Sequence, residues 1–219
     1  MADICSVFSV MDVDNDEDRP SAALSEQVLG NPDILDIILA FASPATIIRL
    51  SWTCRHLLAS KDAYFRRAYN VNRHLSRFFA DPLAFRALQA RTSTLVSGSS
   101  ALQFLDRSYY AGSDLDTYVP YAHTRDVAHW LQSAGYAYES ANEVQAADLE
   151  AAVVQMERES GGDKSIYNMR GVTGVFNFYK RANNVVNDAR LKVQIIVALH
   201  CPMEIVLNFH CSTSIYFIR

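Results

Sequence analysis

Two carboxylates and a Gly-Ser pair are the residues of this chain whose types and spacing can do chemistry. Asp114 and Asp116 are separated by a single apolar residue. In an extended strand, residues i and i+2 point to the same face, so the two carboxylates can converge on one divalent cation. Gly98 and Ser99 lie upstream, between an apolar run and an amphipathic segment. A glycine lets the backbone approach a phosphate closely, and a serine at a helix start can donate its hydroxyl and N–H.

The segments that must position these residues have the pattern of a mixed α/β region. Strands are predicted over residues 94–97, 115–119, 172–180 and 191–197, and helices over 99–105, 124–133 and 202–209. The Asn-rich segment 183–188 predicts a turn or short loop between the last two strands. The polar segment 139–160 fits either a surface helix or an ordered insertion. We expect the strands to pair into an antiparallel or mixed sheet.

A block of short helices precedes this region. Asn31, Pro32 and Asp33 form a typical helix entry, because Asn caps, Pro fits the first helical position and Asp complements the helix dipole. Ser43-Pro44 breaks that helix, and further helices are predicted over residues 45–58, 61–69 and, interrupted at Asp81-Pro82, 73–91. The first three are too apolar for so small a module to bury completely, so we expect part of that surface to face a partner.

Composition limits the class of protein. Half of the 219 residues are apolar, enough for a substantial core, and the four scattered cysteines form no Cys-x-x-Cys pair that would indicate a zinc knuckle. We see no secretion signal and no run near the roughly 20 apolar residues of a membrane span. We therefore expect a soluble protein of the cytoplasm or nucleus that makes no membrane contact. The first twenty residues carry a net charge of −5, and residues 1–23 are expected to be a disordered acidic tail.

The segment from Arg49 to Arg91 is strongly basic. It contains nine Arg and Lys residues against two acids, Asp62 and Asp81, for a net charge of +7. Such a stretch can bind nucleic acid or an acidic partner. Solvated helix faces produce the same pattern, so charge alone leaves both interpretations open.

Residues 28–69 resemble an F-box. The positions that match the family pattern are Pro32, Ile34, Leu35, Ile38, Leu50, Cys54, Arg55 and Leu58, whereas the leucine that usually precedes the proline is Asn31. The resemblance implies that the module binds a Skp-type adaptor of a cullin ubiquitin ligase through its apolar helical faces. It makes Pro32, Ile34, Leu35, Ile38 and Leu50 the candidate partner contacts. The alternative is an ordinary helical subdomain packed against the rest of the chain.

Residues 80–219 resemble the nucleotidyltransferase superfamily to which DNA polymerase beta belongs, and more narrowly the nucleotidyltransferase-like region of fungal F-box proteins. The family pattern is Gly-Gly/Ser, a helix, Asp-apolar-Asp/Glu and a third acid on a later strand. Gly98-Ser99 and Asp114-Leu115-Asp116 match its first parts. The resemblance implies that Gly98 and Ser99 bind a nucleotide and that Asp114 and Asp116 coordinate catalytic Mg²⁺, which stabilises the attacking and leaving oxygens of a phosphoryl displacement.

The third acid of that pattern is replaced here by Gln194. Glutamine offers a metal only an amide oxygen and cannot act as a base. The first hypothesis is therefore an interaction protein: an F-box-type module joined to an inactive nucleotidyltransferase-like domain that serves as recognition platform. The second is an active, Mg²⁺-dependent nucleotidyltransferase that uses Asp114 and Asp116. The alternative interpretation of Asp114 and Asp116 involves no metal. In it, the chain makes a tight turn after Gly112-Ser113, and the Asp side chains cap backbone N–H groups.

The predicted fold class is α+β: an N-terminal F-box-like three-helix module followed by a mixed α/β nucleotidyltransferase-like domain. The predicted boundaries are residues 1–23 for the acidic tail, 24–70 for the helical module, 71–92 for connecting helices and 93–219 for the nucleotidyltransferase-like domain.

Overall fold

The structure is a computed structural model that describes residues 27–160, 171–181, 190–209 and 218. The chain divides into two compact units, Met1–Arg67 and Ala68–Arg219. The predicted acidic tail lies outside the described residues. Among the helices that are described, none combines the length and the apolar character needed to cross a bilayer.

The first unit is helical, with α2 (Pro32–Phe41), α3 (Pro44–Ser51) and α4 (Arg55–Ala68). The predicted helix entry is confirmed, because the Asn31 side chain accepts hydrogen bonds from the N–H groups of Asp33 and Ile34. Ser43 caps α3 in the same way, accepting from the Thr46 N–H at 3.1 Å. Within this unit, Arg67 donates to Asp36 at 2.6 Å and so links α4 to α2.

The predicted boundary between the second and third helices is wrong. α3 ends at Ser51 instead of continuing to residue 58, and α4 already begins at Arg55. The backbone tightens at this point, since the N–H of Trp52 bonds to Arg49 O and that of Thr53 to Leu50 O. The Ser51 and Thr53 hydroxyls also donate to carbonyls three residues back, which competes with continuation of the helix.

The second unit is a five-stranded mixed sheet with helices, as expected from the sequence. Its elements are α5 (Val71–Leu75), α6 (Pro82–Thr92), β1 (Leu95–Ser97), α7 (Gly98–Asp106), β2 (Leu115–Pro120), the 3₁₀ turn η1 (Tyr121–His123), α8 (Thr124–Ser133), β3 (Ala137–Glu139), α9 (Leu149–Ser160), β4 (Val172–Arg181), β5 (Arg190–Ala198) and α10 (Pro202–Leu207). The strand order is β1-β2-β5-β4-β3. β2 and β5 run parallel, and every other neighbouring pair is antiparallel.

The strands predicted from the sequence become β1, β2, β4 and β5, while β3 was not predicted. β3 has only three residues, two of them exposed, so its sequence carries no apolar alternation. Residues 139–160, for which the sequence fits either a surface helix or an ordered insertion, contain the helix α9 preceded by a loop. β4 and β5 pair along their length, but the predicted turn between them lies outside the described residues.

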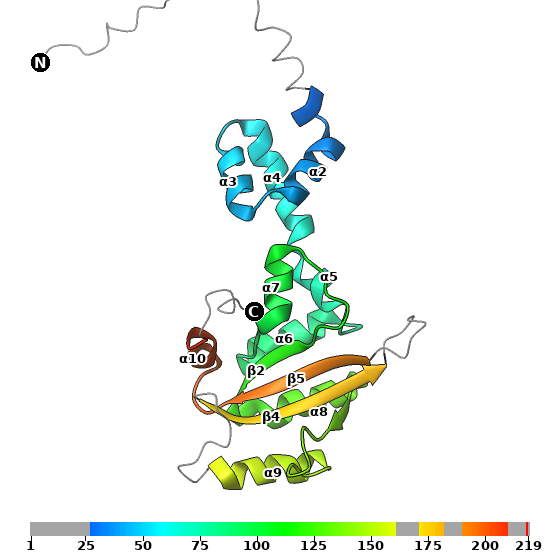
Figure 1. Cartoon of the computed structure of the whole chain (residues 1–219), viewed down its shortest axis with the longest axis vertical. Helices are drawn as coiled ribbons and strands as arrows, with labels where there is room; N and C mark the ends of the chain where they lie inside the picture. The colour runs from blue at the N-terminus through cyan, green and yellow to red at the C-terminus, as the bar shows by residue number, and fades with distance from the viewer. Residues whose placement is uncertain (1–26, 161–170, 182–189, 210–217, 219) are drawn as a thin grey trace, which may run out of the picture. The chain divides into compact units, whose positions relative to one another are not determined.

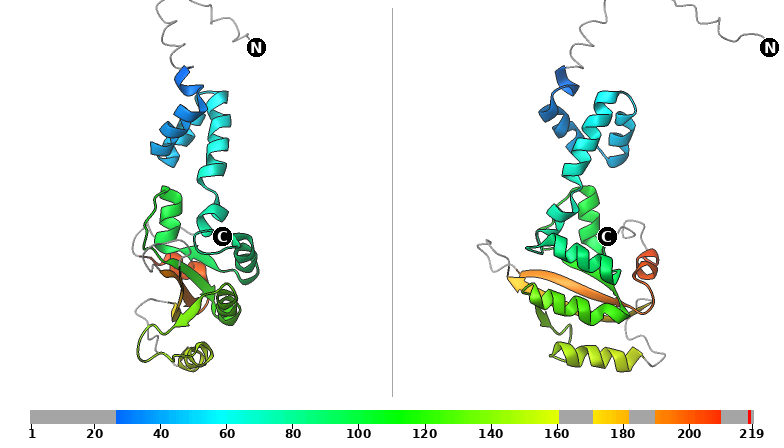
Figure 2. Two further views of the ribbon diagram at one scale, coloured as in Figure 1. Left: turned by 90° about the vertical axis from the view of Figure 1, so that its right-hand side faces the viewer. Right: turned by 180° about the vertical axis from the view of Figure 1, so that it is seen from behind.

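The two faces of the sheet pack differently (Figures 1 and 2). One face carries Leu115 and Val119 of β2 and Val193 of β5, and it buries the apolar sides of α6 and α8 in the main core. The other face carries Tyr118 and Ile196, which pack with Ile205 and Val206 of α10. α10 is short, so it covers the apolar end of this second face.

Candidate functional site

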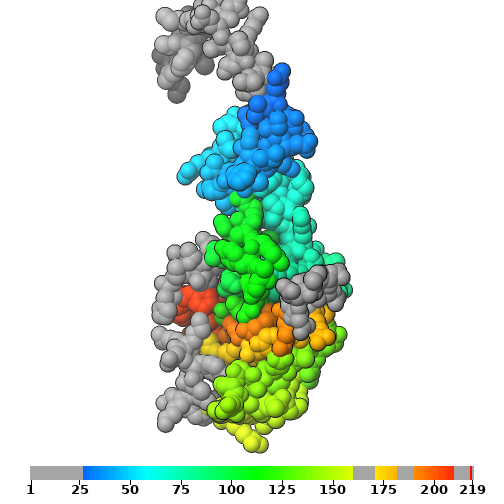
Figure 3. Space-filling model, turned by 45° about the vertical axis from the view of Figure 1, so that its right-hand side comes forward, coloured from blue at the N-terminus to red at the C-terminus, as the bar shows by residue number. Residues whose placement is uncertain are grey.

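A row of polar residues crosses the sheet on the face that also carries α10. Ser97 is in register with Asp116, Asp116 with Gln194, Gln194 with Asn177, and Asn177 with Glu139. Residues paired in register share a face, so these five side chains, hereafter the polar row, run across all five strands. Figure 3 shows β5 and β4 as an orange and yellow band at the surface. The next row in one direction is apolar and lies under α10. Along the polar row itself, Ser97 is buried, the side chains from β2, β5 and β4 are partly buried, and Glu139 is exposed.

Gly98 and Asp116 meet at one end of the polar row. Gly98 is the first residue of α7 and has a φ of +72°. A Cβ built on Gly98 collides with Asp116 Oδ2 and lies 3.2 Å from the Asp116 Cγ. The predicted juxtaposition of the Gly-Ser turn and the carboxylate is therefore present, whereas the Ser99 side chain at the same helix start is exposed.

Asp114 is bound by a lysine. Lys192 Nζ donates to Asp114 Oδ2 at 2.7 Å, and both side chains are partly buried. Burial disfavours the charged ammonium, but the hydrogen bond and negative charge of Asp114 outweigh it and raise the pKa of Lys192. The carboxylate pair therefore already has a cationic partner within the chain.

Gln194 lies where the sequence predicts it, beside Asp116 on the neighbouring parallel strand. Its side-chain amide donates to Asn177 Oδ1 at 2.7 Å on β4. The neighbour of Asp116 on β5 is thus an amide that is hydrogen-bonded to a second amide, and neither group can accept a proton as a base at neutral pH.

In this arrangement one carboxylate of the predicted magnesium pair is already bound to a lysine. A catalytic magnesium site needs carboxylate oxygens free to bind at about 2.0–2.1 Å with near-octahedral geometry. Here Asp114 is engaged by Lys192, and the residue beside Asp116 on β5 is the neutral Gln194. Across the described part of the chain, no group of three or more His, Cys, Asp and Glu side chains is arranged to hold a metal ion.

Asp116 is the residue of the site whose protonation is most perturbed. Burial, with the Asp114 charge added and Lys192 opposing, raises the pKa of Asp116 from 3.8 to about 6. Folded Asp116 therefore keeps its proton to higher pH than the unfolded chain does. Its contribution to stability is present in full below pH 4 and is lost as the pH rises through 6.

We accordingly expect the wild type and Asp116→Asn to differ in their pH dependence. Between pH 4.5 and 7 the free energy of unfolding of the wild type should fall by about 2 kcal/mol relative to the variant, because each unit of pKa shift corresponds to about 1.4 kcal/mol. Urea unfolding across this range, followed by Trp130 fluorescence in a Trp52→Phe background, measures the difference. Parallel pH profiles for the two proteins would contradict the assignment of a buried, protonated Asp116.

The loop that leads into Asp114 is held by two side chains that the sequence did not reveal. Arg77 donates to the carbonyls of Tyr110 and Ala111, at 3.0 and 2.7 Å, and to the Ser113 hydroxyl at 3.1 Å. Gln103 of α7 accepts from the Tyr110 N–H at 2.8 Å. These bonds fix the loop after α7, so Asp114 enters β2 from a defined direction.

Of the residues that sequence analysis missed, Lys192 had a usable signal. It lies two residues before Gln194 on a predicted strand, so the period of two places both on one face. The partner strand and its register were needed to bring Lys192 to Asp114. Arg77 and Gln103 had no such signal, because hydrogen bonds between a side chain and the backbone of a distant loop leave no periodic pattern.

The predicted adaptor contacts differ in exposure within the first unit. Pro32, Ile34 and Ile38 are exposed, and Leu50 is partly buried. Leu35 is only 2% exposed and belongs to the core, so its side chain is not at the surface for a partner. The period of α2 explains the difference, since Leu35 and Leu39 lie on its inner face.

The basic segment from Arg49 to Arg91 belongs to both units. Several of its side chains are used internally: Arg67 binds Asp36, Arg86 donates to Asn72 Oδ1 at 3.1 Å, and Arg77 holds the loop before Asp114. Part of the charge that indicated a nucleic-acid surface therefore has a structural role. Nucleic-acid binding through this segment stays a prediction.

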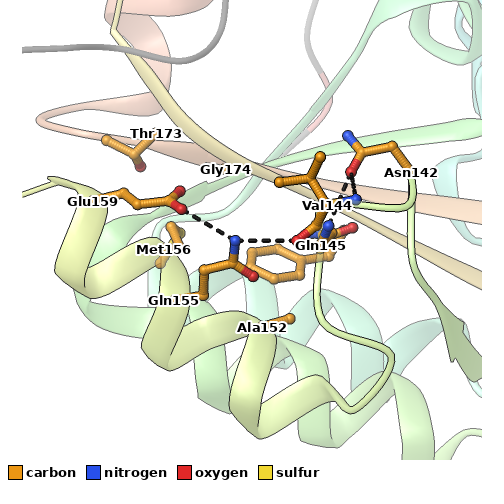
Figure 4. Close-up of a pocket in the computed structure, with 10 residues that line it drawn as sticks. Asn142, Val144, Gln145, Ala152, Gln155, Met156, Glu159, Thr173 and Gly174 are labelled. Carbon is orange, nitrogen blue, oxygen red and sulfur yellow. Dashed lines mark hydrogen bonds between the residues drawn. The ribbon is translucent and has the colours of Figure 1, made fainter.

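A small cavity of about 140 Å³ lies away from the polar row, between α9, the loop before it and β4 (Figure 4). Met156 and Phe176 form part of its apolar lining. Gln155 donates to Val144 O and to Glu159 Oε1, at 3.2 and 3.1 Å, across the pocket. The Gln155 amide at the rim is thus engaged within the chain.

Comparison of the chain with protein-family models, with curated proteins and with solved structures finds no match. The geometry described above is therefore the basis for the functional argument.

Proposed function

We propose that this chain is an F-box-type interaction protein that binds a Skp-type adaptor of a cullin ubiquitin ligase and uses its sheet unit as a recognition platform. The observation that carries the proposal is the exposed apolar surface of the first unit. Ile34, Ile37, Ile38 and Phe41 of α2 are all at least 36% exposed, and Phe41 reaches 90%. Trp52, after α3, is 77% exposed. Solvent exposure of so many large apolar side chains is typical of a protein-binding surface.

The helix arrangement explains why these side chains stay outside. α2 buries Leu35 and Leu39 on one side, and α3 buries Ile47. The other apolar side chains of the two helices have no core left to enter, because each helix is only 8 to 10 residues long. An adaptor that covers this surface would bury it, at about 25 cal/mol per Å² of apolar area.

The sheet unit supports a role in recognition rather than in catalysis. Of its two candidate catalytic residues, Asp114 is bound by Lys192, and the neighbouring Gln194, which cannot act as a base, is bonded to Asn177. Gln194, Asn177 and Glu139 of the polar row still reach solvent with polar groups. A partner could form hydrogen bonds with these groups without any reaction taking place.

The adaptor test uses substitutions at exposed positions. The purified wild type is expected to bind a purified Skp-type adaptor, and Ile34→Asp and Ile38→Asp should each weaken binding at least about tenfold, because an unpaired charge would be buried at the contact. Isothermal titration measures the affinities. Leu35→Asp would unfold the module and therefore cannot serve as a test.

Leu199→Asp is the matched control, since Leu199 in the second unit is 44% exposed and Ile34 is 40% exposed. It should leave adaptor binding unchanged. An adaptor that fails to bind the folded wild type, or that binds Ile38→Asp as tightly as the wild type, would refute the proposed function.

The rival function is a Mg²⁺-dependent nucleotidyltransferase that uses Asp114 and Asp116. One observation favours it, the close approach of Asp116 to Gly98 at the start of α7. It requires the wild type to transfer nucleotide from a labelled NTP with Mg²⁺, and it requires Asp114→Asn and Asp116→Asn to abolish that transfer. We expect no transfer by the wild type, since Lys192 already binds Asp114.

A further inference from the structure

We infer that the ammonium group of Lys192 takes the place of a divalent cation at Asp114 and Asp116 and keeps this carboxylate pair closed to metal. The inference deepens the proposed non-catalytic role of the sheet unit and rests on it. It concerns a residue that the sequence patterns do not single out. It assigns Lys192 the role of a built-in counter-ion.

The pairing of β5 with its neighbouring strands holds Lys192 beside Asp114, so the contact is set by the sheet and is not a chance surface pair. β2 and β5 are parallel, with Leu115 in register with Val193 and Asp116 with Gln194. Continuing that register by one residue places Lys192 beside Asp114, where the Nζ–Oδ2 distance is 2.7 Å. Lys192 is also paired with Tyr179 on β4, so its backbone is held from both sides.

The ion pair is partly buried. The Lys192 and Asp114 side chains are 23% and 37% exposed, less than those of most ion pairs in the second unit. The other charged groups near the lysine are Asp116 and the separate Arg190–Glu139 pair, in which Arg190 also stacks over Tyr179 at 4.2 Å. Arg190 is thus engaged elsewhere, and Lys192 supplies the positive charge at the carboxylates.

Loss of the lysine charge would change what the carboxylates can bind. Two partly buried carboxylates that lie side by side repel each other, and a divalent cation relieves that repulsion. The lysine relieves it first, by donating to Asp114 Oδ2 at 2.7 Å. Removal of the ammonium therefore opens a cation site, whereas a substitution that keeps the charge leaves it closed.

The test measures Mn²⁺ binding to the full chain by isothermal titration and by water-proton relaxation, so it does not depend on enzymatic activity. The wild type and Lys192→Arg are expected to bind Mn²⁺ weakly. Lys192→Met should bind it about tenfold more tightly or better, and adding Asp114→Asn to Lys192→Met should abolish the gain. Lys180→Met is the matched control, because it removes one lysine charge from β4, where Lys180 Nζ binds Ala134 O at 2.7 Å.

Two results would overturn the inference: Mn²⁺ binding by the wild type as tight as that by Lys192→Met, or no gain in any folded variant without the lysine charge. Lys192→Gln provides a second, polar replacement if the methionine variant does not fold, and the same two results apply to it. Adaptor binding by the first unit is measured separately. Its loss would refute the proposed function without altering the Mn²⁺ result, so the two failures can be distinguished.

Discussion

Replacement of Gly98 by alanine is expected to destabilise the sheet unit by about 2–4 kcal/mol. About 1–2 kcal/mol comes from the left-handed backbone that Gly98 adopts, with its φ of +72°, and the rest from the collision of the new Cβ with the Asp116 carboxylate. Asp116 Cγ and Cβ lie 3.2 and 3.4 Å from the position of that new Cβ, so a rotation of the carboxylate oxygens alone leaves a tight contact. Urea unfolding followed by Trp130 fluorescence in a Trp52→Phe background measures the change.

Two controls separate the causes of this loss. Gly112→Ala adds a Cβ that meets nothing within 4 Å and should change stability by no more than about 0.5 kcal/mol. Gly98→Ala made in an Asp116→Ala background should cost only about 1–2 kcal/mol, since the collision is gone and the backbone strain is left. An equal cost in both backgrounds would show that Asp116 and Gly98 do not touch in solution.

The elements with strong periodicity were predicted well because one physical cause determines each of them. The alternation of residues 175–179 lies within β4, and the predicted helix over 124–133 is α8. Asn31 and Ser43 start helices through local hydrogen bonds that need no tertiary context. β3 had no such local cause, since it forms by pairing with β4 from a distant part of the chain.

The residues of the candidate site also differ in whether a local or a long-range cause positions them. Gly98, Asp114 and Asp116 were identified because their chemistry is local and their spacing is short. Lys192 meets Asp114 across 78 residues of sequence, and only the parallel register of β2 and β5 brings them together. The sequence therefore indicated a metal-binding pair, and the structure shows that a lysine is ion-paired with one of its two carboxylates.

Replacement of Phe85 by alanine is expected to have the largest effect on stability, about 3–5 kcal/mol. Phe85 lies on α6 and is fully buried. Its ring stacks on Phe79 at 4.3 Å and lies 5.4 Å from Trp130 of α8. The cavity left by the ring would open the contact between α6 and α8 beneath the sheet. Native-state hydrogen exchange is the measurement of choice, because it follows the two units separately.

The pattern of protection decides how α5 and α6 belong to the fold. The sequence predicts residues 71–92 to be connecting helices, whereas the structure groups them with the sheet in Ala68–Arg219. If they are part of that core, Phe85→Ala lowers the protection of the β5 amides of Val193 and Ile195 by the full amount, and the first unit is unchanged. Leu83→Ala, at a position 61% exposed on the same helix, should cost no more than about 0.5 kcal/mol. Loss of protection confined to α6 would instead mark a connecting segment that the sheet does not need, because a residue outside the cooperative core cannot destabilise its most protected strand.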